Sequence, residues 1–154
     1  DFVPISYATI SALKQAEDYW KVEYQVVVQL MANCPLRAES HILDAMSAFE
    51  NSDEGYQNSC FRFAWMNPWW AVTLDENSFP QPLFLEAQTK RSQDLHPSFC
   101  PTGAVWIANR MSLLNAGTFY GPKHRYHPMA WDAAIDMDDY EDLKMAQTLV
   151  AMSD

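Results

Sequence analysis

The stretch Gln25-Val26-Val27-Val28-Gln29-Leu30 is the strongest indication of fold in this chain. Three consecutive valines predict a β-strand that is buried on both faces, as in the parallel sheet of an α/β protein. The loop 31–37 follows it, and a helix is expected to begin near Ala38. Ligands of open α/β sheets collect at the carboxyl ends of strands, so we expect this loop to form a wall of a binding site.

The segments around this unit continue an alternation of helices and strands. A helix is expected over Ser6–Tyr19, where apolar residues recur at helical spacing, and strands over Ser59–Met66, residues 69–74 and Gly103–Asn109. A short helix is expected over Met111–Leu114 and a final one over Asp139–Met152. Residues 75–100 are rich in proline and polar residues, which predicts an excursion from a single domain that spans residues 1–154.

Composition indicates a folded domain and argues against some partners. The chain has 154 residues, of which 49% are hydrophobic, which is enough for a sizeable core. Its formal charge of −10 disfavours nucleic acid and anionic membranes, because both are bound through basic patches. The three cysteines have no metal-site spacing and no segment is apolar enough for a membrane span, so we expect free thiols and a cytoplasmic location.

An acidic pair near the C-terminus suggests a metal site. Asp136 and Asp138 are one residue apart in an expected extended segment, so both side chains point to the same side. Mg²⁺ commonly takes one or two protein carboxylates and completes its shell with phosphate oxygens and water, which indicates nucleotidyl or phosphoryl transfer. The alternative is that Asp138 caps the following helix, with Glu141 three residues later as in a capping box.

Five segments, in order, resemble the acylneuraminate cytidylyltransferases (CMP-sialic acid synthetases). The resemblance begins near residue 22 and runs to the end of the chain. The segments are Cys34-Pro35-Leu36-Arg37, Arg91-Ser92-Gln93-Asp94-Leu95, Pro101-Thr102-Gly103-Ala104-Val105-Trp106-Ile107, Ser112-Leu113-Leu114 with Phe119-Tyr120-Gly121, and Ile135-Asp136-Met137-Asp138.

The resemblance implies a fold and a reaction. The fold would be the three-layer α/β/α mononucleotide-binding fold, of the nucleotide-diphospho-sugar transferase type. The reaction would join CMP from CTP to a nine-carbon keto sugar acid, a nonulosonic or sialic-type acid, with release of pyrophosphate. A homodimer is implied, with the excursion 75–100 involved in its contact. Mg²⁺ would be held by Asp136 and Asp138, which are also the implied catalytic residues.

The resemblance also assigns binding residues on both sides of the site. The nucleotide side would use Met31, Asn33, Pro35 and Arg37, in a loop similar to the family's L-Q-P-T-S-P-L-R. The sugar side would use Arg91, Gln93, Thr102, Gly103, Trp106, Phe119 and Tyr120. From spacing alone, the aromatic residues among these are more often core. Met31 stands at the family's glutamine and cannot supply the amide hydrogen bonds of that residue.

One part of the family pattern has no match in this sequence. The family begins with a strand and a phosphate-cradling loop, A-R-x-G-S-K-G, so we expect a domain truncated at its N-terminus and inactive by itself. Two other interpretations stay open. One is a non-catalytic remnant of the fold that serves as a binding or dimerisation module, and the other is a nucleotidyltransferase for another sugar acid.

Overall fold

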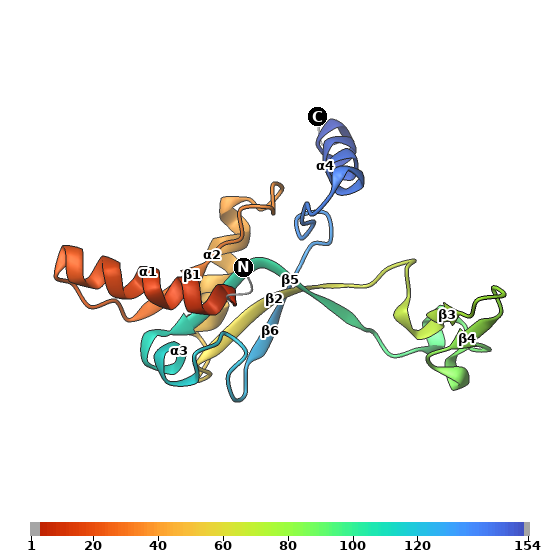
Figure 1. Ribbon diagram of the computed structural model, residues 1–154, viewed down its shortest axis with the longest axis horizontal. Helices are drawn as coiled ribbons and strands as arrows, with labels where there is room; N and C mark the ends of the chain where they lie inside the picture. The colour runs from red at the N-terminus through yellow and green to blue at the C-terminus, as the bar shows by residue number, and fades with distance from the viewer. Residues whose placement is uncertain (1–3, 153–154) are drawn as a thin grey trace. The chain divides into compact units, whose positions relative to one another are not determined.

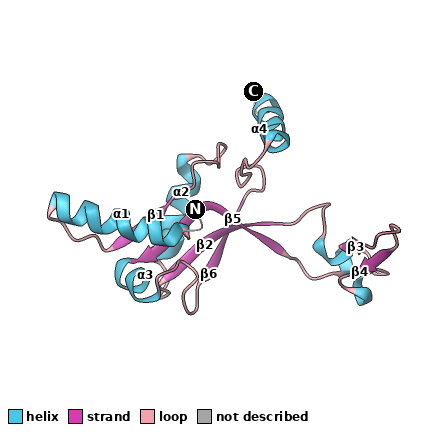
Figure 2. Ribbon diagram, viewed as in Figure 1, coloured by secondary structure: helices cyan, strands magenta, loops and turns pink. Residues whose placement is uncertain are grey.

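The computed structural model describes residues 4–152 and divides the chain into two compact units. The first unit contains the chain up to Phe61 and again from Pro101 onward, and the second contains Arg62–Cys100. Figure 1 shows the course of the chain and Figure 2 its secondary structure. Within the described residues, no helix is long and apolar enough to cross a membrane.

The first unit is built on a four-stranded mixed sheet. Its order is β1 (Val26–Gln29), β5 (Phe99–Asn109), β2 (Tyr56–Arg62) and β6 (Arg125–Met129). β1 pairs antiparallel with β5, so that Val27 lies opposite Ala108, and β2 pairs parallel with β6, so that Asn58 lies opposite Tyr126. Four helices belong to the same unit: α1 (Ile5–Trp20), α2 (Glu39–Glu50), α3 (Arg110–Ala116) and α4 (Tyr140–Met152).

Apolar side chains form a core on each face of this sheet, which gives three layers. On one face, Leu13 of α1 and Leu113 of α3 pack in a cluster with Val27 and Trp106. On the other face, Ala45 and Phe49 of α2 pack in a cluster with Ile107 of β5. Burial of these side chains is the main favourable term that holds helices to the sheet. The expected three-layer α/β/α arrangement is therefore present.

Several expectations about individual strands need correction. The strand at the three valines does not belong to a purely parallel sheet, because it pairs antiparallel with β5. It lies at one end of the sheet and is not buried on both faces. Val27 is 8% exposed, whereas Val28 is 36% exposed. The strand expected over Ser59–Met66 begins earlier, at Tyr56, and ends at Arg62, while β6 was not expected at all.

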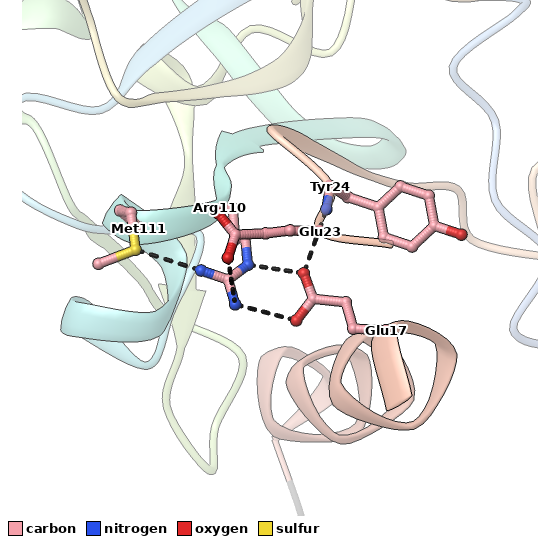
Figure 3. A network of polar contacts seen from close by, with 5 residues as sticks. All are labelled: Glu17, Glu23, Tyr24, Arg110 and Met111. Carbon is pink, nitrogen blue, oxygen red and sulfur yellow. Dashed lines mark hydrogen bonds and ion pairs between the residues drawn. The ribbon is translucent and has the colours of Figure 1, made fainter. Parts of the chain in front are cut away.

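An ion pair joins α1 to the start of α3 (Figure 3). The Arg110 guanidinium donates from Nε to Oε1 of Glu17 at 2.6 Å and from Nη2 to Oε2 at 3.0 Å. The backbone N–H of Tyr24 donates to the same Oε1 at 3.2 Å. The hydrogen bonds from Arg110 lower the pKa of Glu17, so the carboxylate stays ionised near neutral pH. This pair fixes α1 relative to the end of β5.

The second unit is a short excursion built around a β-hairpin. Strands β3 (Val72–Leu74) and β4 (Pro80–Pro82) pair antiparallel, and three short 3₁₀ turns lie at Pro68–Trp70, Leu85–Ala87 and Ser92–Asp94. Trp69 packs edge-on against Phe84, with ring centroids 4.9 Å apart. The expected strand over residues 69–74 is therefore a 3₁₀ turn followed by a three-residue strand, since Pro68 at the start of the turn favours a helical first position.

Candidate active site

Two segments that are far apart in the sequence meet at the candidate site. The loop after β1 contains Asn33, and the segment before α4 contains the acidic pair. The Asn33 side-chain amide donates from Nδ2 to Oδ1 of Asp138 at 3.1 Å. The backbone N–H of Met137 donates to the carbonyl oxygen of Asn33 at 2.9 Å. The expected nucleotide loop and the expected metal pair thus form one surface.

The N-terminus of α4 is capped by Asp139 and not by Asp138. Oδ1 of Asp139 accepts hydrogen bonds from the N–H groups of Glu141 at 2.8 Å and Asp142 at 3.1 Å. In return, Oδ2 of Asp142 accepts from the N–H groups of Asp138 and Asp139. This is a capping box with Asp139 as its N-cap and Asp142 three residues later. The sequence alternative of Asp138 with Glu141 is wrong by one residue, because the helix begins at Tyr140.

This correction leaves the carboxylate of Asp138 outside the helix cap. Asp136 and Asp138 are both exposed to solvent. An open hollow of about 260 Å³ is lined by Asp138 of this pair, together with Met137, Asp139, Tyr140 and Leu143. Hard carboxylate oxygens open to solvent suit Mg²⁺, which keeps several water or phosphate ligands. Within residues 4–152 no cluster of three or more histidine, cysteine or acidic side chains is placed to hold a metal, so this pair would need ligands from a substrate or from water.

Arg37 anchors the loop to the sheet. Its Nη1 donates to the carbonyl oxygen of Met31 at 2.8 Å and to that of Ala104 at 2.9 Å. The Met31 N–H also donates to the carbonyl oxygen of Gly103, at 3.3 Å. The Arg37 guanidinium therefore sets the path of the loop through backbone contacts, while Pro35 is exposed on the same loop.

The side chain of Met31 covers Gly103. A Cβ atom at Gly103 would lie 2.7 Å from Cγ of Met31, which is closer than two carbon atoms can approach without a shift. The thioether packs against both apolar clusters of the first unit. Met31 thus places an apolar side chain at the loop position for which the resemblance implied a glutamine.

Four of the expected sugar-side residues form a connected row. Thr102 donates from Oγ1 to the carbonyl oxygen of Ala134 at 2.9 Å, and the indole N–H of Trp106 donates to the carbonyl oxygen of Thr102 at 2.9 Å. The Trp106 ring lies 5.7 Å from the Phe119 ring and 5.2 Å from the Tyr120 ring. Phe119 is completely buried, whereas Tyr120 is 44% exposed. Within this row, Tyr120 is therefore the ring open to a ligand.

Sequence reasoning missed two aromatic neighbours of Tyr120. The His124 ring lies 5.5 Å from the Tyr120 ring and 5.4 Å from the Tyr126 ring. The Nδ1 atom of His124 lies 3.3 Å from the carbonyl oxygen of Gly121, so a hydrogen bond there requires a proton on Nδ1. Tyr126 belongs to the unexpected strand β6, so no strand pattern could have indicated its position.

Arg91 and Gln93 belong to the second unit. Arg91 donates from Nε to Oδ2 of Asp94 at 2.7 Å and from Nη2 to Oδ1 at 3.1 Å. Gln93 accepts from the hydroxyl of Ser92 at 3.3 Å. These contacts join neighbouring residues of one segment, and binding of a sugar carboxylate by Arg91 and Gln93 stays a prediction.

Cys34 belongs to the loop after β1, and the sequence predicted it to be a free thiol. It is 3% exposed. Burial raises the pKa of its thiol, with Arg37 acting in the opposite direction and the negative charge of Asp136 adding to the rise.

Known proteins resemble this chain in sequence and in fold. Three proteins named N-acylneuraminate cytidylyltransferase, from Streptococcus agalactiae serotypes III, Ia and V, are each 28% identical to it over 118 residues. The match covers 77% of this chain but only 28% of each relative. No protein-family model matches the chain.

A solved structure supports the fold. The crystal structure of 4-diphosphocytidyl-2C-methyl-D-erythritol synthase from Anaerococcus prevotii superposes with a TM-score of 0.60, over 99% of this chain and 68% of that one. The two sequences are 8% identical, so this similarity concerns the fold alone. The chain therefore has the α/β/α fold of the nucleotide-diphospho-sugar transferase type and resembles, over 118 residues, proteins named N-acylneuraminate cytidylyltransferase.

Proposed function

We propose that this chain forms part of a cytidylyltransferase that transfers CMP from CTP to a nonulosonic, sialic-type sugar acid. The observation that carries the proposal is the contact between the loop at Asn33 and the acidic segment at Asp138, because it joins the nucleotide and metal parts of the expected site. The names of the relatives support cytidylyl transfer, and the resemblance found in the sequence supplies the class of sugar.

In the proposed reaction, a sugar hydroxyl oxygen forms a bond to the α-phosphorus of CTP. The bond between that phosphorus and the oxygen bridging to the β-phosphate breaks, pyrophosphate leaves, and the hydroxyl proton is released. A Mg²⁺ ion held by Asp136 and Asp138 would offset negative charge on the phosphates. The loop at Asn33 would position the nucleotide beside this pair, and positioning is a large part of catalysis in phosphoryl transfer.

The proposed sugar side is the aromatic row. Tyr120 would pack against the sugar from its exposed position, while buried Trp106 and Phe119 hold its ring in place. Partial burial raises the pKa of the Tyr120 hydroxyl above its ordinary value, so this group is protonated at neutral pH, as in other tyrosines, and can donate a hydrogen bond. Thr102 and Gly103 would contribute from the start of the buried part of β5.

We also propose a homodimer that forms through the second unit. A large share of its apolar side chains lies on the surface, which is typical of a surface that another protein covers. The exposed ones include Trp65, Met66, Leu74, Phe79, Leu83 and Leu85. A monomeric mass in solution at micromolar concentration would contradict this part of the proposal.

Nucleotide binding tests the proposal directly. Calorimetric titration with CTP should show binding that depends on Mg²⁺, and Asp136→Asn and Asp138→Asn should each weaken it. Asp53→Asn, at an exposed aspartate away from the site, is the matched control and should bind as the native chain does. Pyrophosphate release with several nonulosonic acids then tests the transfer, measured on the chain joined to an N-terminal segment that carries the family's A-R-x-G-S-K-G loop. Equal CTP and Mg²⁺ binding in all three variants would refute the role of the pair.

A non-catalytic binding or dimerisation module is the second candidate function. The arginines of two expected binding segments already make internal contacts, Arg37 with backbone carbonyls and Arg91 with Asp94. Fewer cations would then be available for a triphosphate. CTP titration separates the two functions, since a module of this kind should bind no nucleotide whether or not Mg²⁺ is present. A transferase for another sugar acid would bind CTP but release pyrophosphate with a different acceptor.

A further inference from the structure

Asn33 makes a contact that neither its place in the nucleotide loop nor the acidic pattern explains. The side chain binds Asp138, and the backbone carbonyl binds the N–H of Met137. The bonded side chains are 105 residues apart in sequence. A pair of hydrogen bonds from one residue, one through its backbone and one through its side chain, defines both the position of the acidic segment and the orientation of one carboxylate.

The chemistry of the two groups sets the direction of the side-chain bond. An ionised carboxylate only accepts hydrogen bonds, so the Asn33 amide must donate through its NH₂ group. This engages Oδ1 of Asp138 at 3.1 Å. The carboxylates of Asp139 and Asp142 cap α4, so the carboxylate of Asp138 is not used as a cap. Because the side chain of Asp138 is exposed, its second oxygen is accessible to a cation or to water.

We propose that Asn33 is a positioning residue for the metal, which holds one oxygen of Asp138 so that the other faces the cation of the nucleotide site. This inference rests on the proposed function, because it takes Asp138 to be a metal ligand. A carboxylate on an exposed segment samples several rotamers, and a fixed donor restricts it to those that suit coordination. Asn33 would therefore act through Asp138 instead of contacting the base.

An alanine substitution isolates this role. Asn33→Ala removes the amide donor but keeps the backbone carbonyl that binds the Met137 N–H, so the acidic segment should remain attached to the loop. Asn33→Ser keeps a shorter hydroxyl donor and should recover part of the effect. Asn115→Ala is the matched control, because it removes an exposed amide on α3 away from the site.

The first measurement concerns the contact itself and needs no metal. In ¹⁵N–¹H spectra of the whole chain, the side-chain NH₂ signal of Asn33, identified by its loss in Asn33→Ala, should shift in Asp138→Asn. It should stay in place in Asn115→Ala. An Asn33 signal that does not respond to Asp138→Asn would overturn the inference, whatever the chain does with nucleotides.

The second measurement is Mn²⁺ affinity in the presence of CTP, followed by the loss of the free Mn²⁺ signal in electron paramagnetic resonance. Loss of a residue that orients a metal ligand typically weakens metal affinity by about 10 to 100-fold, so Asn33→Ala should bind Mn²⁺ at least about tenfold more weakly than the native chain. Asn115→Ala should bind as the native chain does. Circular dichroism melts should show that all the variants are folded.

The outcomes separate the inference from the function on which it rests. If the native chain and Asn33→Ala bind Mn²⁺ with equal affinity, the inference is wrong and the proposed function stands. If the native chain binds no Mn²⁺ even with CTP, the proposed function fails at its metal site, and the metal role of Asn33 fails with it. The inference is supported if Asn33→Ala lowers the Mn²⁺ affinity about tenfold and Asn33→Ser recovers part of that affinity.

Discussion

Replacement of Phe119 by alanine should lower the free energy of unfolding of this chain, because the side chain is fully buried. The Phe119 side chain has no exposed area and packs in the cluster that contains Leu13, Leu113 and Trp106. A Phe→Ala change at such a position costs about 3–5 kcal/mol of unfolding free energy, through lost burial and the cavity that remains. The ring contact with Trp106 is part of that loss. For a chain of this size, the melting temperature should fall by about 6–20 °C.

Tyr120→Ala is the matched comparison. Tyr120 contacts the same tryptophan but is 44% exposed, so Tyr120→Ala should lower the free energy of unfolding by only about 1 kcal/mol. The same substitution should weaken the binding of a sugar acid. Urea unfolding of both variants, followed by circular dichroism at 222 nm, gives the two free energies. Equal midpoints for Phe119→Ala and Tyr120→Ala would show that the burial argument is wrong. A loss of sugar binding confined to Phe119→Ala, without loss of stability, would do the same.

Three further predictions concern the site and its surroundings. Asp139→Ala should remove the cap of α4 and lower the stability of this helix by about 1 kcal/mol. Hydrogen exchange of the first-turn amides of α4 should then be faster in Asp139→Ala and unchanged in Asp138→Ala. Burial lowers the pKa of His127 in the folded chain, so the unfolded chain binds a proton at this imidazole more readily. The contribution of His127 to stability should therefore be complete above about pH 6.5 and be lost as the pH falls below that value. Urea midpoints measured against pH should lack this trend in His127→Gln. Cys34 is 3% exposed and burial raises the pKa of its thiol, so alkylation at pH 8 should be much slower than in the chain unfolded in urea, as measured by mass spectrometry.

The segments with strong periodicity were predictable, because their burial follows from local pattern. The helix expected over Ser6–Tyr19 is α1, and the valine stretch is β1. The helix expected to begin near Ala38 is α2, and its apolar residues Ala45 and Phe49 are buried. In each of these elements the residues that decide burial lie within a few turns or pleats of one another.

β6 could not be predicted, because its stability comes from pairing with a distant strand. Its sequence, Arg125-Tyr126-His127-Pro128-Met129, is polar at several positions and contains a proline. Proline is found in sheets at edge strands, where its missing N–H faces away from the ladder. β6 lies at one end of the sheet, beside β2, and the register opposite Gln57 to Phe61 compensates for weak local propensity. The same long-range pairing brings Tyr126 to the aromatic row.

The sequence predicted a set of site residues, whose roles stay predictions, but it did not predict the contacts among them. Order along the chain indicated that the loop at Asn33 and the pair at Asp136 and Asp138 serve one function. The hydrogen bond between Asn33 and Asp138 depends on how two distant segments meet, and the capping role of Asp139 depends on where α4 begins. A shift of one residue would change both the hydrogen-bond partner and the cap, and sequence patterns locate the ends of helices less precisely than that.

Charge gives the physical reason why a cation belongs in the proposed site. Asp136 and Asp138 are negative, the chain carries a formal charge of −10, and a triphosphate would bring more negative charge. Arg37 is the cation of the nucleotide loop, but its Nη1 is bound to the carbonyl oxygens of Met31 and Ala104. A triphosphate beside two uncompensated carboxylates would be repelled, whereas a divalent ion between them turns the repulsion into attraction. The acidic pair and the nucleotide loop can therefore serve the same reaction only with a metal between protein and phosphate, so CTP binding should be weakest when metal is removed and should recover when it is restored.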